Sequence, residues 1–425
     1  MKIRLFLIGF FFIHLDAFSL GGVPVPWIGL CICMLASIKG QFMPFQSLSL
    51  TFLFMIAFFV ASTALNWQTK APNSYIFYRV LSFFGFYMTV NFITLHASSP
   101  QFVNFVEKHA IRIGLLIASI SVFVFFLHVF GLGDLPRNRI GTAGFDQPIA
   151  FTFEVGGLVS RALGTFREPS FLAMALVLPA VIALKNGKWR SLMVITVALS
   201  LTYSLGAFFA IFLGLLTTSV FAMNVGKQLK TLLTYGLLFL TSAYVLLNIF
   251  DDFIFFQRLS LITSIELTET SRGYIYQNLN MLLGSWVSGV GIGGFAFRLS
   301  ELLGSDYPVS SLNLFLNVLT SGGVLALMML LYWIVYPNFL IRRYRMYFTT
   351  REALLLLLPL NIFVFLYLTT FEELHIWHAI GLGLVLGRIK HIRSLCRSAS
   401  AKLNRSMSVN PEHTFIGNRT TRYQL

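Results

Sequence analysis

The sequence predicts an all-α, polytopic integral membrane protein with about twelve transmembrane helices. Of its 425 residues, 56% are hydrophobic and 11% are charged, whereas soluble globular proteins carry about 25% charged residues. The apolar residues form long runs, whereas a transmembrane β-barrel has short alternating segments. The 45 phenylalanines and 15 tyrosines suit the interior and the interface of a bilayer.

The expected spanning helices are the apolar runs 5–22, 24–38, 48–65, 75–95, 111–133, 170–184, 191–204, 206–225, 231–250, 311–338, 353–370 and 374–389. The stretch 191–225 is divided because it is too long for one span, and Gly206 is the expected turn. Lys2 and Arg4 precede the first run as in a signal peptide, but Ala17-Phe-Ser19 is a poor cleavage site. A retained first helix is therefore expected.

The basic residues predict the topology, because lysine and arginine gather in cytoplasmic loops. With the basic C-terminal end placed in the cytoplasm, most of the 31 lysines and arginines fall on that side. Both termini are then cytoplasmic, and the net charge of +15 reflects topology and not nucleic-acid binding. Residues 1–397 form one predicted transmembrane domain, and 398–425 form a basic tail that is expected to be disordered or bound to the membrane surface.

Two long loops lie on the predicted outer side, at about 134–169 and 251–310, where function is expected. They contain no lysine, and their arginines are Arg137, Arg139, Arg161, Arg167, Arg258, Arg272 and Arg298. Arginine without lysine favours bidentate recognition of anions. Salt bridges with the acidic residues of the same loops are the alternative.

The most polar segment is Arg161-Ala-Leu-Gly-Thr-Phe-Arg-Glu-Pro-Ser170, directly before an apolar run. Its arginines present planar donor forks suited to phosphate or pyrophosphate. Pro169 suits the first turn of a helix, whose exposed amides also favour an anion. In the alternative interpretation, Arg167 and Glu168 only mark the water interface.

The second loop contains an amphipathic segment and a glycine-rich segment. Residues 271–283 have apolar side chains at helical spacing, so a helix on the membrane surface is expected, with Ser271 as its cap and Arg272 near the depth of lipid phosphates. A purely structural interfacial helix is the alternative. For 289–295, a tight re-entrant turn is favoured over a nucleotide-binding loop, since no βαβ pattern surrounds it.

Glu372-Glu-Leu-His-Ile-Trp-His378 places acids and histidines within about two helical turns. This pattern is compatible with a metal site, a general base or a proton relay, but an interfacial cluster around Trp377 is favoured. His14, Asp16 and Arg79 are expected to snorkel or to be paired. No Walker loop, catalytic triad or DxD-type site is visible, so a cytosolic nucleotide sugar is not the expected donor.

Four motifs in order resemble the bacterial O-antigen and exopolysaccharide polymerases, within the superfamily of O-antigen polymerases and ligases. The Arg161–Phe171 segment resembles the R-x-x-G-x-F-x-E-P-S pattern of that family. Three further segments are similar to its serine-glycine hairpin, its second-loop arginine with a G-x-G turn, and its asparagine-and-glycine segment, namely Leu199–Ala207, Arg272 with Gly291–Phe295, and Ser310–Gly323. Together they cover about 155–325.

The resemblance implies a GT-C-like, lipid-dependent glycosyltransferase of the bacterial inner membrane with no cofactor and no metal. Its expected substrates are undecaprenyl-diphosphate-linked oligosaccharides, polymerised at the periplasmic face into O-antigen of lipopolysaccharide or another surface polysaccharide. Arg161, Arg167 and Arg272 are the expected ligands of the diphosphate. Glu168 is the expected base for the acceptor hydroxyl, and the further substrate-binding candidates are Asn313, Glu372 and His375.

Three alternatives remain open at this point. O-antigen ligases, which transfer glycan to lipid A-core, usually have a histidine beside that asparagine, but Ser311 and Leu312 precede Asn313 here. A lipid-linked oligosaccharide flippase should carry charge within its spans. A non-catalytic assembly partner is the third. A chain-length regulator and a flippase of the same pathway, together with membrane lipid, are the expected partners.

Overall fold

The part of the chain described by the computed structural model is mainly α-helical. The described residues are 2–37, 46–65, 71–97, 99–132, 135, 152–154, 158–166, 168–222, 278–283, 285–304, 314–365 and 376–409. The helices are α1 Lys2–Ile13, α2 Val25–Ser37, α3 Gln46–Leu65, α4 Asn73–His96, α5 Pro100–Val129, α6 Pro169–Lys185, α7 Trp189–Leu201, α8 Leu205–Ala222, α12 Leu279–Leu283, α13 Gly294–Leu303, α14 Leu314–Arg343, α15 Thr350–Phe365 and α16 Ile376–Val409. The antiparallel strand pairs are β1 Ser19–Leu20 with β2 Val23–Pro24, and β3 Thr152–Glu154 with β4 Leu158–Ser160.

A helix lies at each predicted apolar run except 231–250, which falls outside the described residues. Among the described helices, four are long and apolar enough to cross a membrane, over Leu48–Leu65, Tyr75–His96, Pro100–Val129 and Phe315–Arg343. Five shorter apolar helices accompany them, Ile3–Ile13, Val25–Ala36, Pro169–Lys185, Trp189–Leu201 and Ala210–Phe221. The molecule therefore has the helical, apolar character expected of a membrane protein, and twelve spans remain a prediction.

The first predicted span, 5–22, is not one continuous helix. Helix α1 ends at Ile13, residues 14–18 are irregular, and the β1–β2 hairpin follows. The irregular backbone is possible because it forms hydrogen bonds with a distant segment: the Ala17 amide donates to the Thr165 carbonyl at 3.0 Å. Hydropathy alone could not reveal this break, because the residues remain largely apolar.

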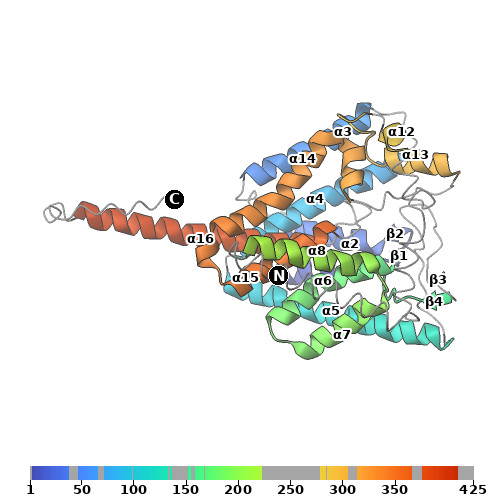
Figure 1. The fold of residues 1–425 in the computed structure, drawn as a ribbon, viewed down its shortest axis with the longest axis horizontal. Helices are drawn as coiled ribbons and strands as arrows, with labels where there is room; N and C mark the ends of the chain where they lie inside the picture. Colours follow the sequence, from blue (N-terminus) through green and yellow to red (C-terminus); the bar gives the residue numbers. More distant parts are fainter. Residues whose placement is uncertain are drawn as a thin grey trace.

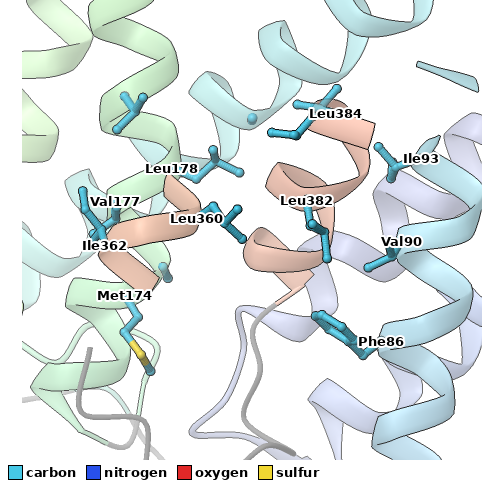
Figure 2. Packing of buried hydrophobic residues seen from close by; sticks show 14 of the residues in the cluster. Phe86, Val90, Ile93, Met174, Val177, Leu178, Leu360, Ile362, Leu382 and Leu384 are labelled. Carbon is cyan, nitrogen blue, oxygen red and sulfur yellow. The ribbon is translucent and has the colours of Figure 1, made fainter. Parts of the chain in front are cut away.

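Helix α6 lies at the centre of the bundle and is buried on nearly all sides. Figure 2 shows Met174 and Val177 of α6 beside Ile362 of α15, while Leu382 of α16 approaches Val90 of α4. A helix that is apolar all round belongs in a core or a membrane. The position of α6 therefore places the preceding residues, 161–166 and Glu168, at the end of a helix that is buried along nearly all of its length.

Close helix contacts depend on glycine. In the α1–α2 pair, a Cβ at Gly9 would overlap the backbone of Gly29, and a Cβ at Gly29 would overlap that of Gly9. In the α4–α16 pair, Gly383 and Gly387 face Ile93 and Ala97 at similar closeness. Small residues let helix backbones approach, which supplies packing energy where water cannot drive association.

The two ends of the bundle differ. Both strand pairs, α12 and α13 lie toward one end, whereas the C-terminal part of α16 projects from the other (Figure 1). Helix α16 continues to Val409, past residue 398, where the sequence predicted a tail that is disordered or bound to the membrane surface. Alanine, leucine, lysine and arginine are good helix formers, so the loss of an apolar period ends the buried face and not the helix.

A buried polar triad joins three helices. The Asn361 Nδ2 group of α15 donates to Thr218 Oγ1 of α8 at 2.9 Å and to Asn338 Oδ1 of α14 at 3.1 Å. All three residues are at most 1% exposed. Interhelical hydrogen bonds of this kind are typical of polar groups inside membrane bundles.

We predict that Asn361→Leu lowers the free energy of unfolding by about 1 kcal/mol, because two buried oxygens lose a donor. Thermal unfolding of the detergent-solubilised protein measures the change. Ser219→Ala is the matched control, since its exposed hydroxyl donates to the Leu215 carbonyl of its own helix. Equal unfolding temperatures for Asn361→Leu and wild type would contradict this role of the triad.

Candidate functional site

The segment from Arg161 to Ser170 connects strand β4 to helix α6. Residues 162–166 are buried, although their backbone is irregular, and Arg161 is half-buried. Gly164 has φ of +54°, and a Cβ there would overlap the Ser121 side chain of α5. Glycine is required at this point both for the left-handed backbone and for the contact. The segment is therefore packed into the bundle and does not lie loosely over it.

Arg161 is held by the turn between α7 and α8. Its Nε donates to the Thr202 carbonyl at 3.0 Å, and the adjacent Ala162 amide donates to the Leu201 carbonyl at 2.8 Å. These bonds fix the direction of the guanidinium, which has five donors in a planar fork. The structure thus brings together the Arg161–Ser170 segment and the 199–207 segment, two of the motifs on which the family resemblance rests.

The α7–α8 turn lies at Thr202–Ser204, earlier than predicted. Helix α8 begins at Leu205, so Gly206 is inside it and the choice of Gly206 as the turn was wrong. Thr202 Oγ1 donates to the Leu199 carbonyl at 2.6 Å and accepts from the Ser204 amide at 3.3 Å. Hydroxyl side chains can replace helical hydrogen bonds in this way, which lets Tyr203 take a φ of 47°.

Glu168 lies at the N-terminus of α6. Its carbonyl accepts from the amides of Phe171 and Leu172 at 3.1 and 3.3 Å, and its exposed carboxylate accepts from Ser170 Oγ at 3.2 Å. Pro169 occupies the first helical turn as predicted. A carboxylate in this position lies near the positive end of the helix dipole. The segment between β4 and α6 thus carries both an exposed carboxylate, which can accept a proton, and the guanidinium of Arg161.

The glycine-rich segment before α13 is a buried turn. Gly289, Gly291 and Gly293 have φ of 66°, 85° and 78°. The Val290 amide donates to the Thr320 carbonyl at 2.7 Å, and the Ile292 amide donates to Thr63 Oγ1 of α3 at 2.9 Å. These two backbone amides therefore donate to protein oxygens, whereas the amides of a nucleotide-binding loop would donate to phosphate. This agrees with the preferred interpretation, a tight turn held inside protein.

The same turn fits into a break in helix α14. Gly323 has φ of 74° and ψ of −172°, a region open to glycine almost alone. In a continuous helix the Val324 amide would donate to the Thr320 carbonyl. Here it donates to the Trp286 carbonyl at 2.9 Å, and the Thr320 carbonyl accepts from Val290 instead. The turn thus supplies hydrogen-bond partners for the backbone groups on both sides of the break, as a broken helix inside a membrane requires.

Arg79 of α4 lies buried beside this turn. It is 7% exposed, its guanidinium carbon lies 4.2 Å from the ring centroid of Tyr75, and its Nη2 donates to the Tyr75 hydroxyl. The Tyr75 ring meets Phe297 of α13 edge to face, with centroids 5.5 Å apart. Arg79 is therefore paired, one of the two outcomes expected from the sequence, and a cation–π contact helps to stabilise it.

Of the residues predicted to act in the site, the structure describes Arg161 and Glu168. The others lie outside the described residues, and they are Arg167, Arg272, Asn313, Glu372 and His375. Their predicted roles stay predictions.

Sequence reasoning missed the segments that hold the site in place. His14 and Thr63 bond to the motif segments, but neither belongs to a recognisable catalytic pattern. The available signal was weak: a histidine and an aspartate in an apolar run.

The chain matches no family model, no curated protein and no solved structure. A functional proposal therefore depends on the chemistry of the motif segments and on their resemblance to a known family.

We predict that Gly323→Ala displaces the 285–291 turn, because a Cβ at this position would overlap the Val287 carbonyl. Gly304→Ala is the matched control, since Gly304 also has a positive φ but has no atom near its Cβ position. The control should cost about 1 kcal/mol from backbone strain, and Gly323→Ala clearly more. Unfolding temperatures and protease sensitivity of the two purified variants measure the difference, and equal losses would rule out the steric account.

Proposed function

We propose that this protein is a membrane glycosyltransferase that polymerises undecaprenyl-diphosphate-linked oligosaccharide repeat units into O-antigen or another surface polysaccharide. The observation that supports the proposal most is the bond from Arg161 Nε to the Thr202 carbonyl. It joins two segments, 161–170 and 199–207, that both resemble the polymerase family although they are separate in sequence.

The reaction is a transfer of the growing chain from one lipid to another. The acceptor hydroxyl at the non-reducing end of the incoming repeat unit attacks the anomeric carbon of the growing chain. The bond from that carbon to the diphosphate oxygen breaks, and undecaprenyl diphosphate leaves with the electron pair. The hydroxyl proton passes to a base. Glu168 is the candidate because its carboxylate is exposed at the N-terminus of α6.

The leaving diphosphate gains negative charge, so cationic donors accelerate its departure if they contact it more strongly in the transition state. Arg161 is half-buried and oriented by a backbone carbonyl, which reduces the cost of reorganisation at the moment of reaction. Arg167 and Arg272 are the further proposed ligands. Arginine suits this role because its planar fork binds phosphate oxygens in a bidentate manner.

The proposed location is the bacterial inner membrane, with both termini in the cytoplasm. The strand pairs, α12 and α13 gather at the end opposite to the projecting part of α16 (Figure 1). Residues of both predicted outer loops are thus found at one end, and the basic C-terminal helix at the other. This arrangement is compatible with a site that faces the periplasm.

We predict that Arg161→Ala lowers the rate of chain growth about a hundredfold, with unchanged amounts of protein in the membrane. Arg272→Ala should have the same effect. Arg190→Ala is the control, because Arg190 is an exposed arginine in the first turn of α7. Chain growth is measured from the glycan ladder on a gel, and near-normal ladders in both loop variants would rule out the diphosphate role.

Deleting the gene in its host tests the function itself. The expected result is a lipid core capped by a single repeat unit, with the ladder lost. Long chains that stay on undecaprenyl diphosphate and never reach the core would instead identify a ligase. Single units retained on the cytoplasmic side would identify a flippase, and an unchanged glycan profile would refute all three.

A further inference from the structure

The irregular segment after α1 is hydrogen-bonded to the candidate site. His14 is 0% exposed, and the Thr165 hydroxyl donates to its carbonyl at 2.7 Å. Three residues later, the Ala17 amide donates to the Thr165 carbonyl at 3.0 Å. Thr165 therefore bonds to this segment through both its side chain and its backbone. These contacts join the beginning of the chain to the Arg161–Ser170 segment, about 150 residues away.

The His14 side chain closes the C-terminal end of α1. The His14 amide donates to the Phe11 carbonyl at 3.0 Å. It therefore does not donate to the Phe10 carbonyl, as it would in a continued α-helix. The Nδ1 atom of His14 lies 2.7 Å from that carbonyl, so Nδ1 carries the proton and donates. Histidine near a helix C-terminus is favourable for this reason.

The same imidazole ring lies between two phenylalanines. It meets Phe10 edge to face with centroids 4.8 Å apart, and Phe166 edge to face at 6.2 Å. Phe166 is 0% exposed and directly precedes Arg167 and Glu168 in the sequence. Movement of the ring would therefore shift the buried backbone that ends at Phe166, two residues before Glu168 in the sequence.

We propose that His14 is a positioning residue for the Arg161–Ser170 segment and acts through the contact of its ring with Phe166. The ring fixes Phe166, and Phe166 fixes the buried backbone from Arg161 to Phe166, which ends two residues before Glu168 in the sequence. The imidazole is fully buried, so it acts on the site through Phe166 and not by touching substrate. The effect on catalysis rests on the proposed function, whereas the effect on the segment does not.

A shift of about 1 Å in a site can reduce a rate by about a hundredfold, whereas binding of a large lipid-linked substrate is spread over many contacts. Loss of the ring should therefore reduce kcat much more than it changes KM. A histidine that served only stability would lower the amount of folded protein and leave the kcat of the remaining protein unchanged.

The chain offers a matched control. His109 of α5 also has its Nδ1 close to the carbonyl four residues earlier, 2.9 Å from Phe105 O, and its ring 4.2 Å from the Phe105 ring, although it is half-buried and lies within a helix. It belongs to a different helix, and among the described residues it forms no hydrogen bond or ring contact with the 161–170 segment. His109→Ala removes a histidine–carbonyl hydrogen bond and an aromatic contact without removing the ring that touches Phe166.

The first experiment measures chain growth by the full-length protein in phospholipid nanodiscs, with lipid-linked repeat units extracted from a strain that lacks the gene. For His14→Ala, kcat should fall at least about tenfold while KM stays within about twofold of wild type. His14→Phe keeps the ring and should restore most of kcat. His14→Asn keeps a donor near the Nδ1 position but has no ring, so its kcat should stay low.

The opposite order, with high kcat for His14→Asn and low kcat for His14→Phe, would overturn the proposal in favour of a helix-capping role. If His14→Ala does not accumulate in the membrane, His14→Asn carries the test, because it keeps the cap. An equal loss of kcat in His109→Ala would also overturn the proposal.

A second measurement does not depend on activity. Glu168→Cys is introduced into a chain whose native cysteines, Cys31, Cys33 and Cys396, are replaced by serine, and a membrane-impermeant maleimide reports its labelling rate. Added His14→Ala should change the rate by more than about threefold, while added His109→Ala should not. An unchanged rate would refute the positioning role. A changed labelling rate, together with no polymer from the wild-type protein that keeps Glu168, would refute the proposed function and leave the positioning role standing.

Discussion

The structure depends on one constraint: in an apolar bundle, each backbone amide and carbonyl must find a partner within the protein. Irregular backbone at 14–18, 161–166, 202–204, 285–291 and around Gly323 meets this constraint through hydrogen bonds within and between these segments and their neighbouring helices. The 161–166 segment bonds both to 14–18 and to the α7–α8 turn, and the 285–291 turn bonds to α14 on both sides of Gly323. The regular helices α4, α6, α15 and α16 supply the apolar packing around these segments.

The same pairing gives the candidate site its shape. Because Thr165 bonds to residues on the α1 side and Arg161 to the α7–α8 turn, the segment before α6 is held from two directions. Its polar side chains then project from a firmly held backbone. A site that must stabilise charge in a leaving group gains from such preorganisation, since little energy is spent on reorganising the donors.

Much of the helical fold could be predicted, because long apolar runs have few alternatives in a membrane. The positions of α3, α4 and α6 follow the predicted runs within a few residues. The break after Ile13 could not be predicted, because it depends on a partner far away in the sequence. The α7–α8 turn was predicted at Gly206 but lies at Thr202–Ser204, where the Thr202 hydroxyl forms local hydrogen bonds. The helical continuation of α16 was missed for a different reason: polar composition was read as absence of structure, although the residues themselves favour helix.

For the site, the sequence by itself determined which residues could do chemistry. Arg161, Glu168 and Pro169 stand out because charge and proline next to a buried helix have specific physical uses. Only the tertiary structure decided what surrounds them: His14 and Phe166 behind the segment, Thr202 beside Arg161, and the turn at 285–291 within the break of α14. Those contacts come from hydrogen bonds and ring packing between distant segments, and residue type and spacing alone do not encode which distant groups will meet.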